Sequence, residues 1–277
     1  MSFRARFRQA ILQSYRALAA RPSWRHVNEL LFDCSIRGLG ILNYENESVS
    51  GECYLMENLL PRLIRRPDPC FVDIGANVGN YSLALIKAFP QCSLLAIEPQ
   101  PTVFKILAKN LSPYTRAKAL NLGAGSSLSE LSLFNYANSE HTEHASLYAD
   151  VFKDLRPSEA IPIAIQVDRL DTIVQAEKFG QHIDLLKIDT EGHEFEALKG
   201  CERLLSEKRI SAIQLEFNDV NPIAGYFLRD LRKLLHDFRV FRMLPRGLLT
   251  VSETPIRSEL FAFQNLLFVH KELEFRV

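Results

Sequence analysis

From residue 70 onwards, apolar runs typical of buried strands alternate with helix-like segments, and this alternation constrains the fold more than any other feature. The predicted strands cover residues 70–75, 93–99, 117–125, 161–168, 183–188 and 211–218, and the predicted helices cover residues 80–89, 102–111, 169–174, 194–205 and 227–238. Strands that are connected by helices form a mostly parallel sheet with helices on both faces. The pattern therefore predicts a doubly wound α/β fold.

Three segments depart from this alternation. Residues 130–136 alternate apolar and polar side chains, which is typical of an antiparallel strand. Residues 238–244 and 265–270 predict a closing antiparallel pair of strands near the end of the chain. No repeat, low-complexity tract or linker follows residue 51. We therefore predict a helical extension over residues 1–50 and one domain over residues 51–277.

The composition is that of an ordinary globular protein, with 47% hydrophobic and 24% charged residues. The formal net charge is zero, which argues against a nucleic-acid partner held by bulk electrostatics. No apolar run approaches the roughly 20 residues of a membrane span. Five cysteines are scattered without a CxxC pair, which indicates a reducing compartment and a cytoplasmic protein. No feature predicts an oligomeric state.

The first 25 residues predict a basic helix with an apolar stripe. The stripe consists of Phe3, Phe7, Ile11, Tyr15 and Leu18, and no acidic residue precedes Glu29. Amphipathic helices usually pack on a core, so we expect this helix to cap the main domain. Two alternatives stay open: a transit peptide, and a helix that associates peripherally with a membrane surface.

The end of the first predicted strand, FVDIGANVGN, has the properties of a ligand-binding turn. In doubly wound sheets, ligands bind beyond the carboxyl ends of the strands. Gly75 and Gly79 permit a tight turn and a close backbone approach to a ligand. Glu98 ends the second strand, where an acid commonly accepts hydrogen bonds from both ribose hydroxyls. These features predict a site for an adenosine-containing ligand.

The charge near this turn favours one such ligand over another. The dinucleotide fingerprint G-x-G-x-x-G lacks its middle glycine, because Ala76 and Asn77 follow Gly75. The carboxylate of Asp73 would repel a pyrophosphate but attract a cation. S-adenosylmethionine is cationic and has no phosphate. The sequence therefore favours S-adenosylmethionine over NAD.

The chain resembles the FkbM family of S-adenosylmethionine-dependent methyltransferases. The resemblance rests on FVDIGANVGNYS, AIEPQP and DLLKIDTEGHEFEALKG, and spans roughly residues 51 to 220. It implies a class I methyltransferase (Rossmann-like) fold, with a seven-stranded, mostly parallel sheet, helices on both faces and a C-terminal antiparallel hairpin. It also implies methylation of a hydroxyl group on a sugar, a glycan or glycolipid, or a polyketide-like acceptor.

The resemblance also implies a set of cofactor-binding residues. Asp73, Gly75, Asn77 and Gly79 would surround the methionine part, and Glu98 would hold the ribose. The turn over residues 123–126 would lie near the adenine, with backbone or serine contacts because it has no acid. The full predicted cofactor site consists of Asp73, Gly75, Asn77, Gly79, Asn80, Glu98, Pro99, Gly123, Ala124 and Asp189.

The stretch KIDTEGHE supplies the predicted catalytic residues Asp189, Glu191 and His193. A hydroxyl acceptor is a weak nucleophile, so a general base or a metal ion helps. His193 has an ordinary pKa near neutrality and is the first choice of base. Glu191 would orient His193, bind the cofactor ammonium or act as base. We expect Glu194 to act structurally, at the start of the following helix.

A divalent metal is the alternative to a protein base. Asp189, Glu216 and Asn218 are oxygen ligands at the ends of two predicted neighbouring strands, and together they would suit Mg²⁺.

The acceptor is expected to be a small molecule or a glycan. Its pocket would be shaped by the helix near residues 51–66, by the loop over residues 136–160, in which Ser146 matches a serine-containing segment of the family, and by residues 219–226.

Two other functions compete with O-methylation. The first is an N-methyltransferase that acts on an amine or a protein. N-methyltransferases of planar amides and bases often carry N/D-P-P-Y/F after the fourth strand, where this chain has Asp189, Thr190, Glu191 and Gly192. The second is an NAD-dependent oxidoreductase, which Asp73 and Asn77 disfavour.

Overall fold

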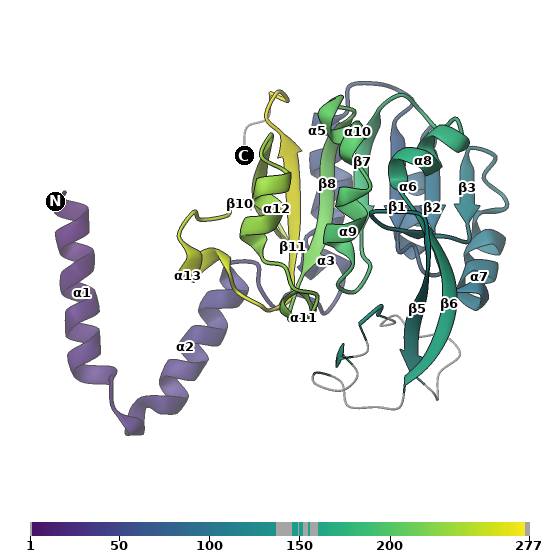
Figure 1. The fold of residues 1–277 in the computed structure, drawn as a ribbon. Helices are drawn as coiled ribbons and strands as arrows, with labels where there is room; N and C mark the ends of the chain where they lie inside the picture. The colour runs from purple at the N-terminus through teal and green to yellow at the C-terminus, as the bar shows by residue number, and fades with distance from the viewer. Residues whose placement is uncertain (1, 137–145, 149, 152–154, 156–159, 275–277) are drawn as a thin grey trace.

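The computed structural model describes residues 2–136, 146–148, 150, 151, 155 and 160–274, and it contains a layered α/β body from which two N-terminal helices project (Figure 1). Its main sheet has eight strands in the order β10-β9-β11-β8-β7-β1-β2-β3. The strands are β1 (Cys70–Ile74), β2 (Ser93–Ile97), β3 (Ala117–Leu120), β7 (Ile183–Ile188), β8 (Ile210–Phe217), β9 (Phe238–Leu244), β10 (Gly247–Thr250) and β11 (Gln264–His270).

Strand directions confirm the predicted class I methyltransferase fold. Neighbouring strands from β3 through β2, β1 and β7 to β8 are parallel. Strand β11 lies antiparallel between β8 and β9, so the predicted closing antiparallel pair is confirmed. The sheet has one strand more than the expected seven, because the chain turns back after Leu244 and adds β10 to β9 as an antiparallel edge.

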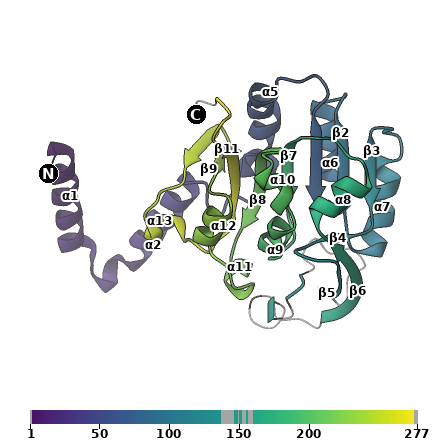
Figure 2. The same cartoon turned by 45° about the horizontal axis from the view of Figure 1, so that its top comes forward.

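Helices cover both faces of this sheet (Figures 1 and 2). One face packs against α8 (Leu170–Ala176), α9 (Glu194–Lys199), α10 (Glu202–Ser206) and α12 (Leu228–Leu234). The other face packs against the helical segment of residues 52–63, α6 (Asn80–Ala88) and α7 (Pro101–Leu111). Within β1, Val72 and Ile74 belong to the first core and Phe71 to the second. Burial on both faces explains the continuous apolar runs.

A second, three-stranded sheet has the order β4-β6-β5 and lies beside the main sheet. Strand β5 (Ser129–Tyr136) pairs antiparallel with β6 (Ala160–Asp168), as the alternation of residues 130–136 predicts. The predicted third strand over 117–125 is divided in two. Its first part is β3, and its second part, β4 (Gly123–Ala124), leaves the main sheet and pairs in parallel with β6.

The helical segment over residues 52–63 changes its hydrogen-bond pattern just before Pro61. It consists of α4 (Glu52–Tyr54), the π-helical η2 (Leu55–Leu59) and α5 (Leu60–Leu63). The backbone N–H of Leu60 donates to the carbonyl of Leu55, five residues earlier. Proline has no backbone N–H, and in an α-helix its ring clashes with the carbonyl four residues earlier. The wider π-helical turn relieves this clash. The predicted interruption is therefore a π-helical turn.

The N-terminal helices do not cap the main domain, which corrects the favoured prediction. Helices α1 (Phe3–Ala19) and α2 (Arg25–Gly38) meet at the short turn η1 (Pro22–Trp24) and extend away from the sheet (Figures 1 and 2). Phe3, Phe7 and Ile11 of the predicted stripe are exposed. Among the described residues, no helix combines the length and apolar character that crossing a bilayer requires.

The chain joins the body earlier than the predicted boundary at residue 50. Ile41 is fully buried, and the short helix α3 (Glu47–Ser50) packs beside β9. Gly40 and Gly51 both approach residues of β9 so closely that a Cβ atom would overlap them. We propose that the extension ends at Gly38 and that the domain begins with the following residues.

The glycine after β1 is predicted to be indispensable for the fold. Gly75 has φ 76°, and a Cβ at this position would lie 1.7 Å from the carbonyl oxygen of Asp189. We expect Gly75→Ala to lower the free energy of unfolding by about 3 kcal/mol or more, because the clash involves backbone atoms and the φ is left-handed. Gly247→Ala is the matched control, since nothing lies within 4 Å of its Cβ position and its φ is not left-handed. Denaturant unfolding of both variants measures the difference, and equal stabilities would refute it.

Candidate active site

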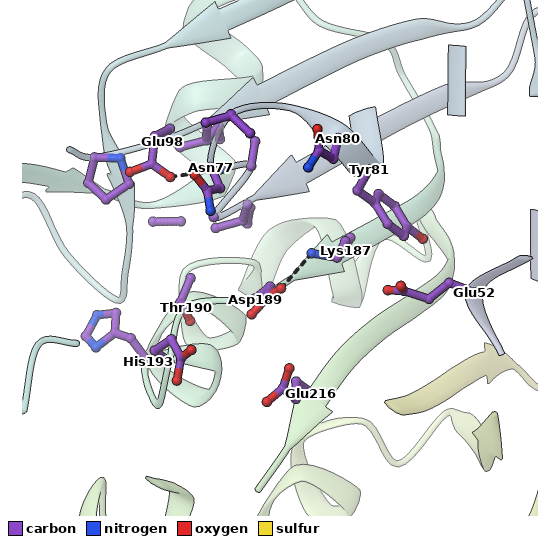
Figure 3. A pocket seen from close by; sticks show the side chains of 18 of the residues that line it. Glu52, Asn77, Asn80, Tyr81, Glu98, Lys187, Asp189, Thr190, His193 and Glu216 are labelled. Atoms are coloured by element: carbon purple, nitrogen blue, oxygen red, sulfur yellow. Dashed lines mark hydrogen bonds and ion pairs between the residues drawn. The ribbon is translucent and has the colours of Figure 1, made fainter. Parts of the chain in front are cut away.

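A cavity of about 650 Å³ lies where the strands of the main sheet end (Figure 3). Its lining includes residues 74–78 at and beyond the end of β1, residues 97–100 at and beyond the end of β2, residues 189–191 after β7, and Glu216 in β8. This is the edge at which a doubly wound sheet binds ligands. The structure thus brings the predicted cofactor loop and the predicted catalytic turn to one cavity.

The glycine loop lines the cavity except at Gly79. Gly75 lines it as predicted, and its close backbone neighbour is the Asp189 carbonyl. Gly79 does not line the cavity. It has φ 93° and lies at the start of α6, where a Cβ would meet the side chain of Leu107. Asn77, with φ 50°, and Asn80 do line the cavity.

Asp73 lies beneath the loop rather than in the cavity lining. Its side chain is fully buried, and Oδ2 accepts a hydrogen bond of 2.7 Å from the Ser82 hydroxyl. Oδ1 is buried without a hydrogen-bond partner among the described residues. Burial raises the pKa of Asp73, which the nearby Lys187 opposes. The structure therefore places the Asp73 carboxylate outside the cavity lining, and its direct contact with the methionine part stays a prediction.

Glu98 occupies the position predicted for the ribose anchor. Its Oε2 accepts from the backbone N–H of Asn77 at 3.0 Å, and its Oε1 from the N–H of Gln100 at 2.8 Å. Each oxygen keeps acceptor capacity for a further donor. Burial raises the pKa of Glu98 to about 7, against the lowering effect of the two N–H groups. Pro99 also lines the cavity, and Asn121 donates to the carbonyls of Glu98 and Pro99 at 2.9 Å.

The second sheet closes the cavity with an apolar surface beside the predicted adenine turn. Gly123 and Ala124 line the cavity as predicted. Apolar side chains complete this surface: Leu147, from the predicted pocket segment 136–160, and four that sequence reasoning did not assign to the site, Leu122, Leu133, Ile165 and Val167. The alternation of apolar and polar residues over 130–136 could have predicted this surface, since the apolar face of such a strand must pack against another part of the protein or a ligand.

The turn after β7 is built around the buried carboxylate of Glu194. Its Oε1 accepts from the N–H groups of Thr190 and Gly192, at 3.0 and 3.1 Å. Its Oε2 accepts from the hydroxyl of Tyr226. Gly192 has φ 108°, which permits the bend. Glu194 therefore shapes the turn, in agreement with its expected structural role.

Ser146, which was expected to touch acceptor or cofactor, instead supports the same turn. Its side chain is fully buried and is absent from the cavity lining. Its hydroxyl donates to the carbonyl of Glu191 at 2.7 Å and accepts from the N–H of Tyr148. Residues 137–145 of the predicted pocket loop lie outside the described part of the chain.

Asp189 and His193 both line the cavity but have different neighbours. The Asp189 carboxylate pairs with the Lys187 ammonium, with Oδ2 and Nζ 2.8 Å apart (Figure 3). His193 lies on the side of the second sheet, where a Cβ on Gly125 would be 3.2 Å from its Nε2. Burial lowers the pKa of His193, so the imidazole is neutral at pH 7. Its Nδ1 is buried without a hydrogen-bond partner among the described residues.

Lys187 is a buried cation that sequence reasoning did not assign to the site. Its Nζ lies 4.8 Å from the centre of the Tyr81 ring. Burial would lower the pKa of Lys187, but the carboxylates of Asp189, Asp73 and Glu52 outweigh it and raise the pKa. Lys187 thus stays charged and balances the acids around it. The position of Lys187 in an apolar strand could have predicted this role, because a lysine that is buried in a protein is usually paired with an acid.

Glu216 lines the cavity as predicted, whereas Asn218 does not. The Asn218 amide donates to the Glu216 carboxylate at 2.6 Å. Burial and the charges of Asp189 and Glu191 raise the pKa of Glu216 well above its ordinary value, which favours the protonated acid. The described residues contain no group of three or more His, Cys, Asp or Glu side chains that could hold a metal ion.

The remaining wall comes partly from segments that were not predicted. The pocket wall expected from residues 51–66 is present in Glu52, Cys53 and Met56, but residues 219–226 do not contribute. Residues 44–47, Phe263 and Asn265 contribute instead. The Tyr44 and Phe263 rings meet edge to face, with centroids 5.8 Å apart.

The cavity lining is strongly acidic. Its acidic side chains are Glu45, Glu47, Glu52, Glu98, Asp189, Glu191 and Glu216, of which Glu216 is favoured in the neutral, protonated form. Among the described residues of the lining, Lys187 is the only lysine or arginine. A pyrophosphate would bring two further negative charges into this field, whereas a cation would be attracted. Glu98 and this field therefore fit a nucleoside that carries a positive charge and no phosphate.

Comparison with known proteins identifies the family. The family model described as the methyltransferase FkbM domain matches residues 73–243. The chain belongs to the FkbM methyltransferase family. It is a methyltransferase, and the family implies S-adenosylmethionine as methyl donor.

The chain is similar to two named methyltransferases and to one solved structure. The methyltransferase sdnD of Sordaria araneosa is 30% identical over 179 residues, which are 56% of this chain and 67% of the relative. The 2-O-methyltransferase NoeI of Sinorhizobium fredii (strain NBRC 101917 / NGR234) is 26% identical over 200 residues, which are 67% of this chain and 78% of the relative. A solved FkbM methyltransferase from Methylobacillus flagellatus KT is 21% identical with a TM-score of 0.47, and the match covers 78% of this chain but 47% of the solved one.

Cofactor affinity is predicted to rise with pH through the pKa of Glu98. The raised pKa, about 7, means that the free protein takes up this proton as the pH falls through neutrality. Ribose hydroxyls donate to the ionised carboxylate, so protonation competes with binding. We expect the Kd for S-adenosylhomocysteine to be about tenfold higher at pH 6 than at pH 8.

Isothermal titration calorimetry measures this dependence. Glu98→Gln should bind more weakly at every pH and lose the dependence over this range. A wild-type Kd that is constant from pH 6 to pH 8 would contradict the assignment.

Proposed function

We propose that this methyltransferase transfers the methyl group of S-adenosylmethionine to a hydroxyl of a sugar, a glycan or glycolipid, or a polyketide-like acceptor. The observation that carries the proposal is the shared cavity of Glu98 and the 189–193 turn, which puts a ribose anchor and candidate bases around one space. The relative NoeI is named a 2-O-methyltransferase, which supports a hydroxyl acceptor. The edge-to-face pair of Tyr44 and Phe263 at the cavity wall offers an apolar surface for the acceptor.

Two alternatives have less support. The turn after β7 reads Asp189, Thr190, Glu191, Gly192, without the N/D-P-P-Y/F sequence common among N-methyltransferases of planar groups. An NAD-dependent oxidoreductase would have to hold a pyrophosphate in an acidic cavity. O-methylation therefore has more support than N-methylation or NAD-dependent oxidation.

The residues of the cavity act mainly by aligning the methyl donor with the acceptor and by removing the proton of the acceptor hydroxyl. When bound, S-adenosylmethionine supplies an activated methyl group. Glu98 would hold the ribose, and the loop at Gly75 and Asn77 would position the rest of the donor beside the proposed catalytic turn. Alignment of two reactants can lower a barrier by on the order of 7–11 kcal/mol at best. The acceptor hydroxyl must then lose its proton to a group in the cavity wall.

His193 is the proposed general base. The imidazole is neutral at pH 7 because burial lowers its pKa, so it can accept a proton. Glu191 shares the turn and would orient His193 or stabilise its protonated form. Asp189 is held by Lys187 and is proposed to meet the cationic part of the donor.

A magnesium ion is the second way to activate the hydroxyl. Asp189, Glu216 and Asn218 would hold the ion, which would lower the pKa of the acceptor hydroxyl. Activity lost in EDTA and restored by Mg²⁺ would assign this route, and unchanged activity in EDTA would assign the protein base.

We also propose that the protein works in a reducing compartment such as the cytoplasm. All five cysteines are free, and Cys70, Cys92 and Cys201 are buried. Screening sugars and glycolipids with labelled methyl donor would identify the acceptor class.

The proposed base gives a specific kinetic prediction. We expect His193→Ala to lower kcat by roughly a hundredfold or more while the Kd for S-adenosylhomocysteine changes little, because general-base catalysis contributes about 10²–10⁴-fold. The wild-type kcat/KM should rise with pH through a pKa below 6.5 and then level off, since the base acts unprotonated. Methyl transfer assays over pH 5–8 measure both quantities.

His236→Ala is the matched control, because His236 is exposed and lies outside the cavity lining. Full activity of His193→Ala would remove His193 from the mechanism. Glu191→Gln and Asp189→Asn, tested in the same assay, would then show which carboxylate takes its place.

A further inference from the structure

The projecting N-terminal arm, residues 2–38, carries apolar side chains that no described part of the body covers. On α1, the exposed fractions of Phe3 and Phe7 are 83% and 62%, and on α2 that of Leu30 is 62%. Large exposed apolar surfaces mark interaction sites or membrane contacts. The exposed apolar surface of the arm is therefore suited to binding another molecule or a membrane.

These side chains are arranged in stripes rather than scattered. Phe3, Phe7, Ile11 and Leu18 are spaced by four, four and seven residues, which places them on one face of α1. On α2, the exposed residues Val27, Leu30, Leu31 and Cys34 follow the same helical spacing. Each helix thus offers a continuous apolar face.

The charge of the arm identifies the chemistry of its occupant. The first 28 residues contain six arginines and no acidic residue: Arg4, Arg6, Arg8, Arg16, Arg21 and Arg25. All six are exposed. A second copy of α1 laid along the first would bring arginines against arginines, and like charges repel. A surface that is both apolar and anionic matches the arm in both respects.

Hydrogen bonds join the two helices of the arm to each other and join the arm to the body. At the elbow, Tyr15 donates to the side chain of Asn28 at 2.5 Å, and Asn28 donates to the carbonyl of Ala19 at 3.0 Å. At the body, Arg37 donates to the carbonyl of Leu42 at 2.7 Å. The N–H of Leu42 donates to the carbonyl of the cavity residue Phe263, also at 2.7 Å.

We propose that the arm docks this protein on an anionic lipid bilayer. The apolar face of α1 inserts at the boundary between head groups and acyl chains, and the arginines contact lipid phosphates. Because Leu42 joins the arm to the cavity wall at Phe263, docking tethers the wall of the cavity to the membrane-bound arm. The proposal does not depend on the identity of the methyl acceptor.

Vesicle co-sedimentation of the full chain tests the proposal. We expect binding to phosphatidylcholine vesicles that contain phosphatidylglycerol, and far weaker binding to phosphatidylcholine alone. The triple variant Arg4→Gln, Arg6→Gln, Arg8→Gln should lose about a hundredfold in partition coefficient. The control variant Lys87→Gln, Lys109→Gln, Arg246→Gln removes the same charge from exposed sites on the body and should bind as the wild type does.

A second readout follows the apolar face. The single tryptophan, Trp24, lies in the elbow, so its fluorescence should shift to the blue when anionic vesicles are added. Phe3→Ser, Phe7→Ser, Ile11→Ser should abolish both the shift and the binding without changing the Tm of the body. Failure to bind anionic vesicles would overturn the proposal. So would equal loss in the control variant, or a dimer in sedimentation velocity that only the serine variant dissociates.

Discussion

The contact between Gly75 and the carbonyl oxygen of Asp189 is the constraint on which the site depends. It joins the turn after β1 to the turn after β7 with no side chain between them. The N–H of Asp189 donates to the carbonyl of Ile74, and the N–H of Gly75 donates to that of Ile97, so three strand ends are locked together. The turns after β1, β2 and β7, which carry the proposed cofactor loop, ribose anchor and catalytic residues, therefore have fixed positions relative to one another.

Charge balance is the second constraint. The cavity gathers carboxylates that repel each other, and burial raises the pKa of Glu52, Glu98 and Glu216. Lys187 offsets part of this repulsion through its ion pair with Asp189. Glu52 reaches the same region from the helical segment before β1, where its carboxylate accepts from Gln214 at 2.8 Å. A cationic donor fits this field because it supplies charge that the protein lacks.

Much of the fold could be predicted because the relevant signals are local. Apolar runs, helix spacing and the glycines at 75 and 192 specify the strands, the helices and the turns, and parallel strands bring their carboxyl ends together. The placement of Glu98 and of Asp189 beside β1 follows from the same rule. The detachment of β4 could not be read in this way, because it depends on pairing with β6, more than forty residues later.

Details of individual side chains were missed for a similar reason. Asp73 has the sequence position of a ligand contact, but its orientation is decided by a hydrogen bond to Ser82, which only the fold brings near. Lys187 gains its role from Asp189, two residues later, and from Asp73 and Glu52, which only the fold brings near. The amphipathic pattern of α1 was recognised correctly, yet a stripe alone does not reveal what covers it.

The central claim is that the cavity holds a phosphate-free, cationic nucleoside with its ribose on Glu98. A crystal structure of the protein bound to S-adenosylhomocysteine, the product that lacks the methyl group, tests it most directly. The account predicts both ribose hydroxyls within hydrogen-bond distance of the Glu98 carboxylate, the adenine against Ala124 and Val167, and the amino-acid end beside the 189–191 turn. A ribose bound away from Glu98, or a cavity that stays without nucleoside at saturating ligand, would contradict it.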